Sequence, residues 1–423
     1  MVKLRHSLRY LVPFALYFLV AVIITYPLIT VLESRLLGHP FGDAAEYVRH
    51  IWWIKYALQT GQPIFDQPLL LYPRGLSGSW LWGAPLQSFP AWLFAFVMPL
   101  PAAFNLSALL TLALNGTGMY ALAKHLLTTE SAESKEKRRL TTENTENTES
   151  GDKRQSTAES AENAESKEKR RLTTENTENA EDESSVLSPQ SSLFSVLLAS
   201  FLAGLIFMLY PAMQGHLGAA HTGLLVQWGA PLLLLALLRV GESRRWMIAG
   251  ALLFPVALWG SLLLLIYLVA PILAVYLLRA AGDRRSFRRA VITLLIGGVI
   301  AAPFLLPTLR ETVGATESGA VRYSSALLGI AAPSFNHPLF GGLEYARQIL
   351  GADPFESAAY AGVIVVTLAL IGVITRRAAR WWLIVAAGAW LLSLGALLKL
   401  TDAPITVMVG GYATTIPLPG LLM

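Results

Sequence analysis

Long apolar runs alternate with short polar connections along the chain, which is the pattern of a polytopic membrane protein. A helix needs about 20 apolar residues to cross the ~30 Å hydrocarbon core of a bilayer. Runs of that length, or nearly so, lie at 10–32, 105–127, 193–212, 219–239, 290–309, 357–375 and 381–398. The apolar stretch 246–279 is too long for one crossing, so we expect a tight hairpin of two short helices there. The pattern predicts an all-α fold, a polytopic transmembrane helical bundle with about nine spans.

Basic residues give the expected orientation of this bundle. They cluster at 3–9, 239–245, 279–289 and 376–380. All four clusters fall on the cytoplasmic side, as the positive-inside rule requires, if the proline-rich stretch 84–100 is a half-inserted or interfacial helix. We therefore expect a multi-pass protein of the plasma (inner) membrane with a cytoplasmic N-terminus. Two large loops, 33–104 and 310–356, then face the exterior.

Residues 128–192 are a different kind of sequence. They hold 16 acidic and 10 basic residues, and the 15 residues at 133–147 recur identically at 165–179. Because a segment with so few apolar residues cannot offset its ordering entropy, we expect a low-complexity, disordered cytoplasmic insert. It separates an N-terminal transmembrane module, 1–127, from a bundle at 193–423. No closing helix or polar tail follows the last apolar residues, so we expect this bundle to be truncated.

Composition narrows the class of function. The chain is 54% hydrophobic and 14% charged, which excludes an ordinary soluble enzyme. Outside 128–192 there remain 12 acidic and 23 basic residues, so the basic character comes largely from the cytoplasmic loops and we expect no nucleic-acid partner. The chain has no cysteine, which excludes thiol catalysis, thiolate metal sites and disulfides.

The most informative polar residues follow the first apolar run. If a helix runs from about 44 to 60, then four polar residues cluster on one face: Asp43, Glu46, Tyr47 and His50. Trp52 and its apolar neighbours would place this helix in the membrane interface. Two carboxylates at headgroup level suit acid–base catalysis on a lipid-borne substrate. The same Asp-x-x-Glu spacing is also a helix capping box with Asp43 as N-cap, and the two roles are compatible.

The order of these features resembles the GT-C superfamily, polytopic glycosyltransferases that use polyprenyl-phosphate-linked sugars, and in particular its uncharacterised bacterial members. The motifs are Gly42-Asp43, Trp52-Trp53, Leu71-Tyr72-Pro73-Arg74-Gly75, and His216 and His221 ahead of Gln227-Trp228. The resemblance implies a polyprenyl-phosphate sugar donor, an extracytoplasmic glycan or protein acceptor, and Asp43 as the general base. The superfamily commonly has a second acidic residue after a later helix, where this chain offers His216 and His221. We therefore assign no metal site and leave open whether a divalent cation is required.

Transfer from a lipid phosphate also needs cationic or donor groups near the departing phosphate. Arg49 and Arg74 are exterior candidates, and Arg74 lies in a glycine-containing loop with Tyr72, although a plain headgroup contact explains it equally well. His216 and His221 lack the i, i+4 spacing of helical metal ligands and are expected at the exterior mouth of the bundle, as substrate contacts or as satisfied interface histidines. With Glu46 as a second catalytic carboxylate, the candidate substrate-binding residues are His50, Trp52, Tyr72, Arg74, His216 and His221.

A lipid-linked glycan transporter or flippase is the main alternative, followed by a non-catalytic membrane assembly subunit. Ion-coupled transport normally needs ionisable groups inside the bilayer, and the expected spans carry only the polar Asn115 and Gln227 near their middles. No phosphate-binding Gly-x-x-x-x-Gly-Lys loop is present either. The sequence therefore favours chemistry on the exterior face.

Overall fold

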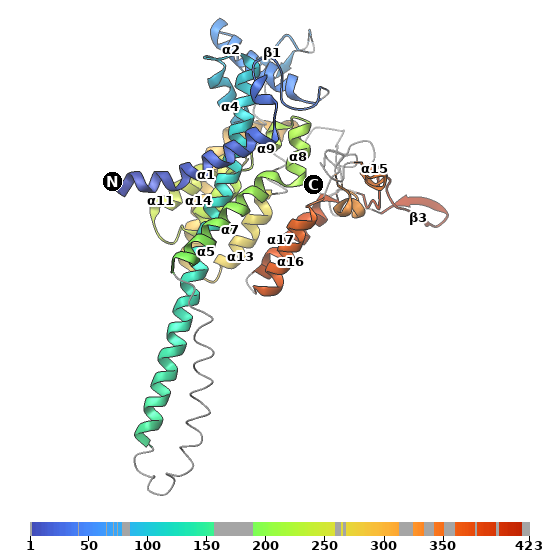
Figure 1. The fold of residues 1–423 in the computed structure, drawn as a ribbon. Coiled ribbons are helices and arrows are strands. Elements are labelled where there is room, and N and C mark those ends of the chain that lie inside the picture. Colours follow the sequence, from blue (N-terminus) through green and yellow to red (C-terminus); the bar gives the residue numbers. More distant parts are fainter. Residues whose placement is uncertain are drawn as a thin grey trace. The chain divides into compact units, whose positions relative to one another are not determined.

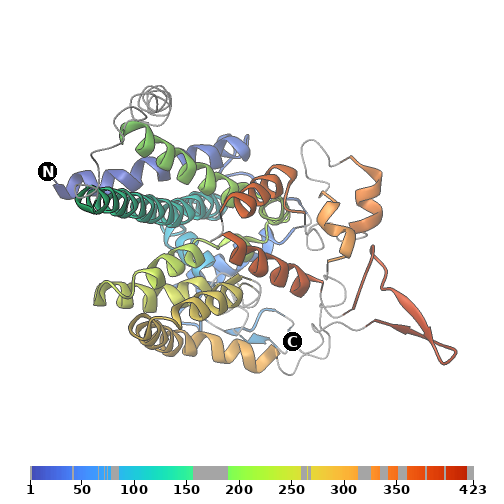
Figure 2. The same ribbon diagram turned by 90° about the horizontal axis from the view of Figure 1, so that it is seen from below.

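The computed structural model describes residues 2–40, 42–64, 66–70, 72–73, 75–77, 85–155, 189–258, 264, 268–312, 325–333, 342–350, 360–376, 379–394 and 397–416. It is mostly helical, with two small two-stranded sheets (Figures 1 and 2). The chain separates into two compact units, one made of Met1–Leu122 with Ala203–Met423 and the other of Ala123–Leu202.

The first half of the chain contains α1 (Val2–Ile24), η1 (Leu28–Thr30), α2 (Ala44–Thr60), β1 (Asp66–Gln67), β2 (Leu76–Ser77), α4 (Pro85–Phe94), α5 (Leu100–Gln155), α7 (Pro189–Leu209), α8 (Pro211–Gly218) and α9 (Thr222–Leu225). The second half contains α10 (Gly229–Leu238), α11 (Arg244–Leu258), α13 (Ala270–Ala280), α14 (Arg284–Thr312), η4 (Leu327–Ala331), α15 (Glu344–Leu350), α16 (Val363–Thr375), α17 (Arg380–Ser393), β3 (Thr406–Val409) and β4 (Tyr412–Thr415).

Two described helical stretches are long and apolar enough to cross a membrane, Leu100–Thr129 in α5 and Arg284–Pro303 in α14. A third span results if α7 and α8, which bend by 43° between Leu209 and Pro211, are counted as one. The helical fold class is thus confirmed, and its apolar helices are compatible with a membrane protein. By length and composition the described residues support two to three spans, and nine are not shown.

Other expected spans are shorter helices than the apolar runs that predicted them. The first run, 10–32, is helical only to Ile24, and the 219–239 run is divided between α9 and α10. The stretch 246–279 contains two short helices, α11 and α13, as expected. The stretch 84–100 contains the ten-residue α4, and α16 and α17 lie where 357–375 and 381–398 predicted helices.

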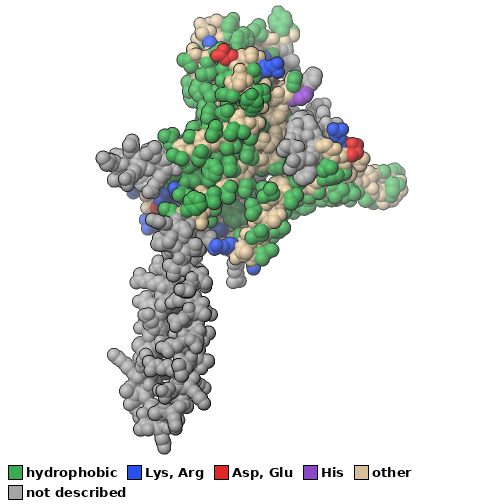
Figure 3. Space-filling view, in the orientation of Figure 1, with side chains coloured by type: hydrophobic (Ala, Val, Ile, Leu, Met, Phe, Trp, Pro, Cys, Tyr) green, Lys and Arg blue, Asp and Glu red, His purple; other side chains and the backbone are tan. Residues whose placement is uncertain are grey.

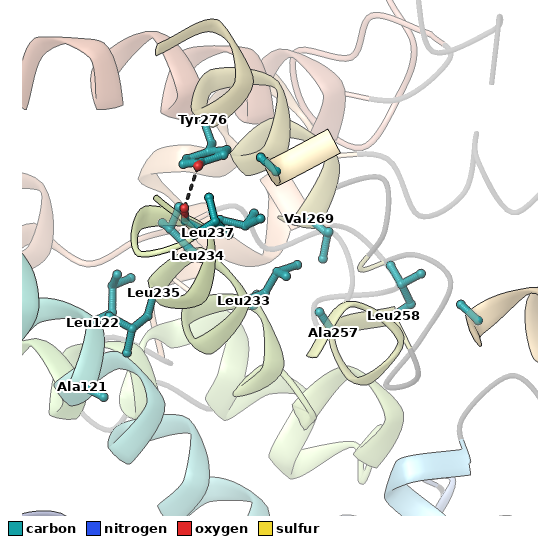
Figure 4. Close-up of a cluster of buried hydrophobic side chains, with 14 residues drawn as sticks. Ala121, Leu122, Leu233, Leu234, Leu235, Leu237, Ala257, Leu258, Val269 and Tyr276 are labelled. Atoms are coloured by element: carbon teal, nitrogen blue, oxygen red, sulfur yellow. Dashed lines mark hydrogen bonds between the residues drawn. The ribbon is translucent and has the colours of Figure 1, made fainter. Parts of the chain in front are cut away.

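A buried core forms where α10 packs against α11, α13 and the part of α5 around Ala121 and Leu122 (Figure 4). Leu233 and Leu237 of α10 are almost fully buried, and they share this cluster with Ala257 of α11. Tyr276 of α13 donates a hydrogen bond of 2.6 Å from its hydroxyl to the Leu237 carbonyl oxygen. This bond satisfies the one polar atom that the tyrosine brings into an apolar cluster.

Glycines allow α1, α5 and α7 to approach closely. Tyr17 of α1 is fully buried, and a Cβ placed on Gly116 of α5 would lie between 2.7 and 3.0 Å from three of its ring atoms. A Cβ on Gly204 of α7 would overlap the tyrosine hydroxyl and would lie 2.6 Å from the Gly116 carbonyl oxygen. The three helices therefore meet at a point that only glycine can occupy.

Asn105 fixes the start of the first large loop. Its fully buried side chain accepts a 2.9 Å hydrogen bond from the Leu37 N–H and donates to the carbonyl oxygens of Leu32 and Arg35 at 2.9 and 2.7 Å. Three backbone groups of the loop thus depend on one amide in α5.

Replacing Asn105 by alanine is expected to lower the free energy of unfolding by about 1–3 kcal/mol, because buried backbone groups lose their partners. Thermal unfolding of the purified protein in detergent measures this. The matched control is Ser107→Ala, two residues further along the same helix. An equal loss in both variants would contradict the role assigned to the asparagine.

Two short antiparallel hairpins, which the sequence did not predict, accompany the helices in the described residues. β1 pairs with β2, and β3 pairs with β4 in antiparallel register from Thr406 opposite Thr415 to Val409 opposite Tyr412. Gly410 and Gly411 form the turn with φ of +57° and +87°, the backbone conformation that favours glycine in two-residue hairpin turns.

Helix α5 extends into the segment for which the sequence predicts disorder, and that prediction is not tested by the structure. Helix α5 continues without a break to Gln155. Residues 128–155 are rich in glutamate, lysine and arginine, which favour helix without any apolar core to pack against. Residues 156–188 lie outside the described part of the chain.

Candidate functional site

Helix α2 carries the acidic residues at the bounds that the sequence predicted. It begins at Ala44 and ends at Thr60, followed by Gly61 with φ of +69°. Asp43 occupies the N-cap position but forms no side-chain capping hydrogen bond. Instead, its carboxylate oxygen Oδ2 lies 3.5 Å from Nε2 of His221. The capping-box interpretation is therefore wrong for this side chain, and the carboxylate is directed to another segment of the chain.

Backbone hydrogen bonds hold the two segments together. The His39 N–H donates to the Gly218 carbonyl oxygen at 2.6 Å, and the Asp43 N–H donates to the Ala219 carbonyl oxygen at 3.0 Å. A Cβ on Gly42 would overlap that same carbonyl group, so glycine permits this close approach. Asp43 is thus positioned by its main chain against the α8–α9 connection, with its carboxylate beside His221.

The two histidines form the next contact. Nδ1 of His216 in α8 lies 3.3 Å from Nδ1 of His221, so one nitrogen must donate and the other accept when both rings are neutral. A carboxylate facing Nε2 of His221 favours the tautomer with its proton there. His221 then accepts at Nδ1 and His216 donates. The three side chains therefore form a chain from Asp43 through His221 to His216.

Tyr47 links α2 to α9 beside this chain. Its hydroxyl has a hydrogen bond with the backbone of Gly223, and burial, with a smaller contribution from Asp43, raises its pKa to about 12. The tyrosine hence keeps its proton at neutral pH and adds no negative charge next to Asp43. The sequence spacing placed Tyr47 on the face of Asp43 but gave it no contact with residues beyond 200.

Glu46 has partners of its own. Its Oε1 lies 3.7 Å from Arg49 Nη2 and 3.7 Å from His50 Nε2, while Arg49 Nη2 lies 2.8 Å from His50 Nε2. Arg49 also donates to Gln67 Oε1 at 2.5 Å, which joins α2 to β1. The expected pair of catalytic carboxylates is therefore divided: Asp43 faces histidines and Glu46 faces an arginine.

His50 is buried and uncharged at neutral pH. Burial first, and the adjacent Arg49 second, lower its pKa from 6.5 to about 4. A neutral ring accepts the hydrogen bond that Arg49 donates to Nε2. His50 therefore supports the position of Arg49 and carries no positive charge at neutral pH.

The other candidate residues are not brought to Asp43 by any contact of the described residues. Trp52 stacks on Tyr56 with ring centroids 5.3 Å apart, on the outside of α2, and Tyr72 is 83% exposed. Arg74 lies outside the described residues. Within the described parts of the chain, no three histidine, aspartate or glutamate side chains are grouped so that they could hold a metal ion.

A small recess lies behind the site. Its cavity volume is only about 10 Å³, and it is lined by Ile51, Phe104, Ser107, Ala108, Thr111, Thr222 and Leu225. Three of the lining residues, Ser107, Thr111 and Thr222, carry hydroxyl groups, and Thr222 directly follows His221 in the chain.

Stability is expected to fall with acidification because of His50. Its pKa is lowered in the folded protein, so the unfolded chain binds the extra proton between pH 6.5 and about 4. Folding loses up to about 3 kcal/mol across this window, and the loss is absent above pH 6.5. Melting temperatures measured from pH 7.5 to 4.5 test this. His50→Gln is expected to flatten the dependence, and an equally steep decline in that variant would contradict it.

Sequence reasoning missed the contact between Asp43 and His221, because helical spacing compares only near neighbours. The available signal was a pair of small-residue segments, Gly42-Asp43 and Gly218-Ala-Ala-His221, since small residues permit close backbone approach. No protein-family model, curated protein or solved structure matches this chain.

Proposed function

We propose that the protein is a membrane glycosyltransferase that moves a sugar from a polyprenyl-phosphate donor to an extracytoplasmic acceptor, with Asp43 as general base. The observation that carries the proposal is the environment of this carboxylate. Its side chain is 48% exposed, it does not cap its helix, and a histidine from a distant segment faces one of its oxygens. A carboxylate held in this way remains available to a substrate, and the sequence resemblance to the GT-C superfamily supplies the substrate class.

The arrangement provides what a transfer reaction needs at the acceptor. His221 faces Oδ2, which leaves Oδ1 to accept the proton of the acceptor hydroxyl. As the acceptor oxygen forms its bond to the anomeric carbon, the bond from that carbon to the donor phosphate breaks and the proton passes to Asp43. The departing phosphate takes the electron pair and needs a cation, for which Arg49 and Arg74 are the nearest candidates in sequence.

The proposed orientation places this site outside the cell. Charged side chains appear around α2 at one end of the visible face and at the lower margin of the bundle, with hydrophobic side chains between them (Figure 3). We propose that the belt between lies in the bilayer, with about nine crossings in total, α4 interfacial and the arginines of α11 and α14 cytoplasmic. The N-terminus and the 128–192 segment are then cytoplasmic.

The absence of cysteine makes this orientation directly testable. A cysteine at the exposed Tyr72 is expected to react with a membrane-impermeant maleimide in intact cells. A cysteine at the exposed Phe287 in α14 is expected to react only after permeabilisation. The opposite pattern would overturn the orientation and, with it, the exterior location of Asp43.

The activity itself is tested in membranes that contain the full chain and a radiolabelled polyprenyl-phosphate sugar. Transfer of label to an extracytoplasmic product supports the proposal. Movement of the labelled lipid across the bilayer without transfer would instead support the flippase. If neither occurs with any donor, the assembly-subunit alternative is favoured.

A further inference from the structure

A dense group of arginines lies where α11 and α14 begin. Residues 239–289 contain eight arginines and only two acidic residues. Glu242 is paired with Arg239 at 2.7 Å, and Asp283 accepts a hydrogen bond from the Arg285 backbone N–H. The exposed arginines are Arg244, Arg245, Arg279, Arg284, Arg285 and Arg288.

Helices α11 and α14 are parallel neighbours, so their first turns, which carry arginines, lie at the same end of the pair. A Cβ on Gly250 would lie 2.8 Å from Thr293 Cγ2, and a Cβ on Gly297 would lie 2.7 Å from Phe254 Cβ. Because the later residue of α11 contacts the later residue of α14, the two helices run in the same direction. Arg244 and Arg245 precede Gly250 by six and five residues, and Arg288 precedes Thr293 by five, so these three charges lie at the same level along the two helices.

The same face of α14 changes from basic to aliphatic. From Arg288, steps of three or four residues lead to Ile292, Leu295 and Val299, which are 40%, 65% and 74% exposed. At 1.5 Å per residue the stripe extends about 16 Å beyond Arg288, close to the depth of one bilayer leaflet. Only 22% of the apolar window of this candidate span is buried inside the protein. The face is thus open to a molecule with an anionic head and a long apolar tail.

Helix α11 repeats the arrangement. Arg244 and Arg245 are followed by Ile248 and Leu252, which are 62% and 55% exposed. Ile248 and Leu252 lie two residues to either side of Gly250, which faces α14, so they point away from α14. Leu295 and Val299 likewise point away from α11, so the two aliphatic stripes lie on different sides of the helix pair, and the face considered below is that of α14. A soluble anion would use the arginines but not the aliphatic stripe.

We propose that this face of α14 binds an anionic glycerophospholipid, with its phosphate on the arginines at the start of α14 and its acyl chains along Ile292, Leu295 and Val299. Guanidinium groups bind phosphate oxygens through paired hydrogen bonds. Their attraction to an anionic leaflet adds to the apolar contact of the chains. The lipid site uses neither Asp43 nor the exterior loops, so the test of lipid binding is independent of the test of transferase activity.

The test uses the purified full-length chain in mixed micelles with equal amounts of phosphatidylglycerol and phosphatidylcholine, and native mass spectrometry counts the lipids retained. The wild-type protein is expected to retain phosphatidylglycerol preferentially. Arg285→Gln with Arg288→Gln is expected to reduce the preference roughly tenfold. The matched control is Arg376→Gln with Arg380→Gln. It removes the same charge at the end of α16 and the start of α17, and it is expected to keep the preference for phosphatidylglycerol.

Two further measurements separate the contribution of the acyl-chain contacts from that of the phosphate group. Leu295→Ala with Val299→Ala is expected to weaken retention while leaving the charge unchanged, and inorganic phosphate is expected to displace the lipid poorly. Undiminished preference in the arginine variant, an equal loss in the control, or efficient displacement by phosphate would overturn the proposal. If the arginine variant does not fold, Arg285→Lys with Arg288→Lys keeps the charge and is expected to retain part of the lipid preference. Complete loss of the preference in this folded lysine variant would also overturn the proposal.

Discussion

Replacing Asp43 by asparagine is expected to lower the rate of sugar transfer by about 10²–10⁴-fold, the range that general acid–base catalysis contributes. Asparagine keeps the size of the side chain and can still accept a hydrogen bond from His221. It cannot accept the proton of the acceptor hydroxyl, so the acceptor must attack without a base. The measurement is transfer of labelled sugar in membranes, with protein amount and melting temperature checked in parallel.

The matched control is Asp66→Asn. Asp66 is an exposed carboxylate in β1 of the same large loop, and its replacement makes the same change in charge. The control is expected to leave transfer unchanged. Unchanged transfer in Asp43→Asn would remove Asp43 from the mechanism. An equal loss in both variants would indicate that the charge of the loop, rather than a base, is required.

Replacing Gly116 by alanine is expected to destabilise the fold. The new methyl group would lie within 2.7–3.0 Å of the Tyr17 ring, and that ring is fully buried among α1, α5 and α7. Overpacking of a closed site costs about 1–3 kcal/mol, a large fraction of the stability of a typical domain. We expect a lower melting temperature and less protein in the membrane.

Two companion variants give this prediction its control. Gly298→Ala in α14 adds the same methyl group where no atom lies within 4 Å, and it is expected to be neutral or slightly stabilising. Adding Tyr17→Ala to Gly116→Ala removes the ring that the methyl group meets, so the two changes together are expected to cost less than the sum of their separate costs. Strict additivity would contradict the contact as the cause.

The sequence predicted α2 accurately because local signals agree there. The periodicity of apolar residues sets its length, and the residues around Asp43 and Gly61 mark its two ends. The bent pair α7–α8 and the division of 219–239 into α9 and α10 were not predicted. Apolarity alone does not indicate where a helix bends, and Pro211 and Trp228 lie inside runs that are otherwise continuous.

The chemistry of the site could be predicted only in part. Spacing along α2 correctly grouped Glu46 with His50, but it joined Asp43 to them instead of to His221. The partners of Asp43 depend on how the first loop packs against the α8–α9 connection, which is a property of the tertiary fold. The β3–β4 hairpin had a local signal, Gly410-Gly411 between short apolar segments, but it lies in an apolar stretch that we assigned only as an end without a helix.

The contact between Asp43 and His221 can form only late in the synthesis of the chain. Roughly 180 residues must be added after Asp43 before its partner exists, and at 5–20 residues per second this takes roughly 10–35 s. The compact unit Ala123–Leu202 accounts for much of that interval. During this time the first loop is already made, but the hydrogen bonds from His39 and Asp43 to Gly218 and Ala219 cannot form. Whatever the insert contributes otherwise, its presence lengthens the time for which the nascent site is incomplete.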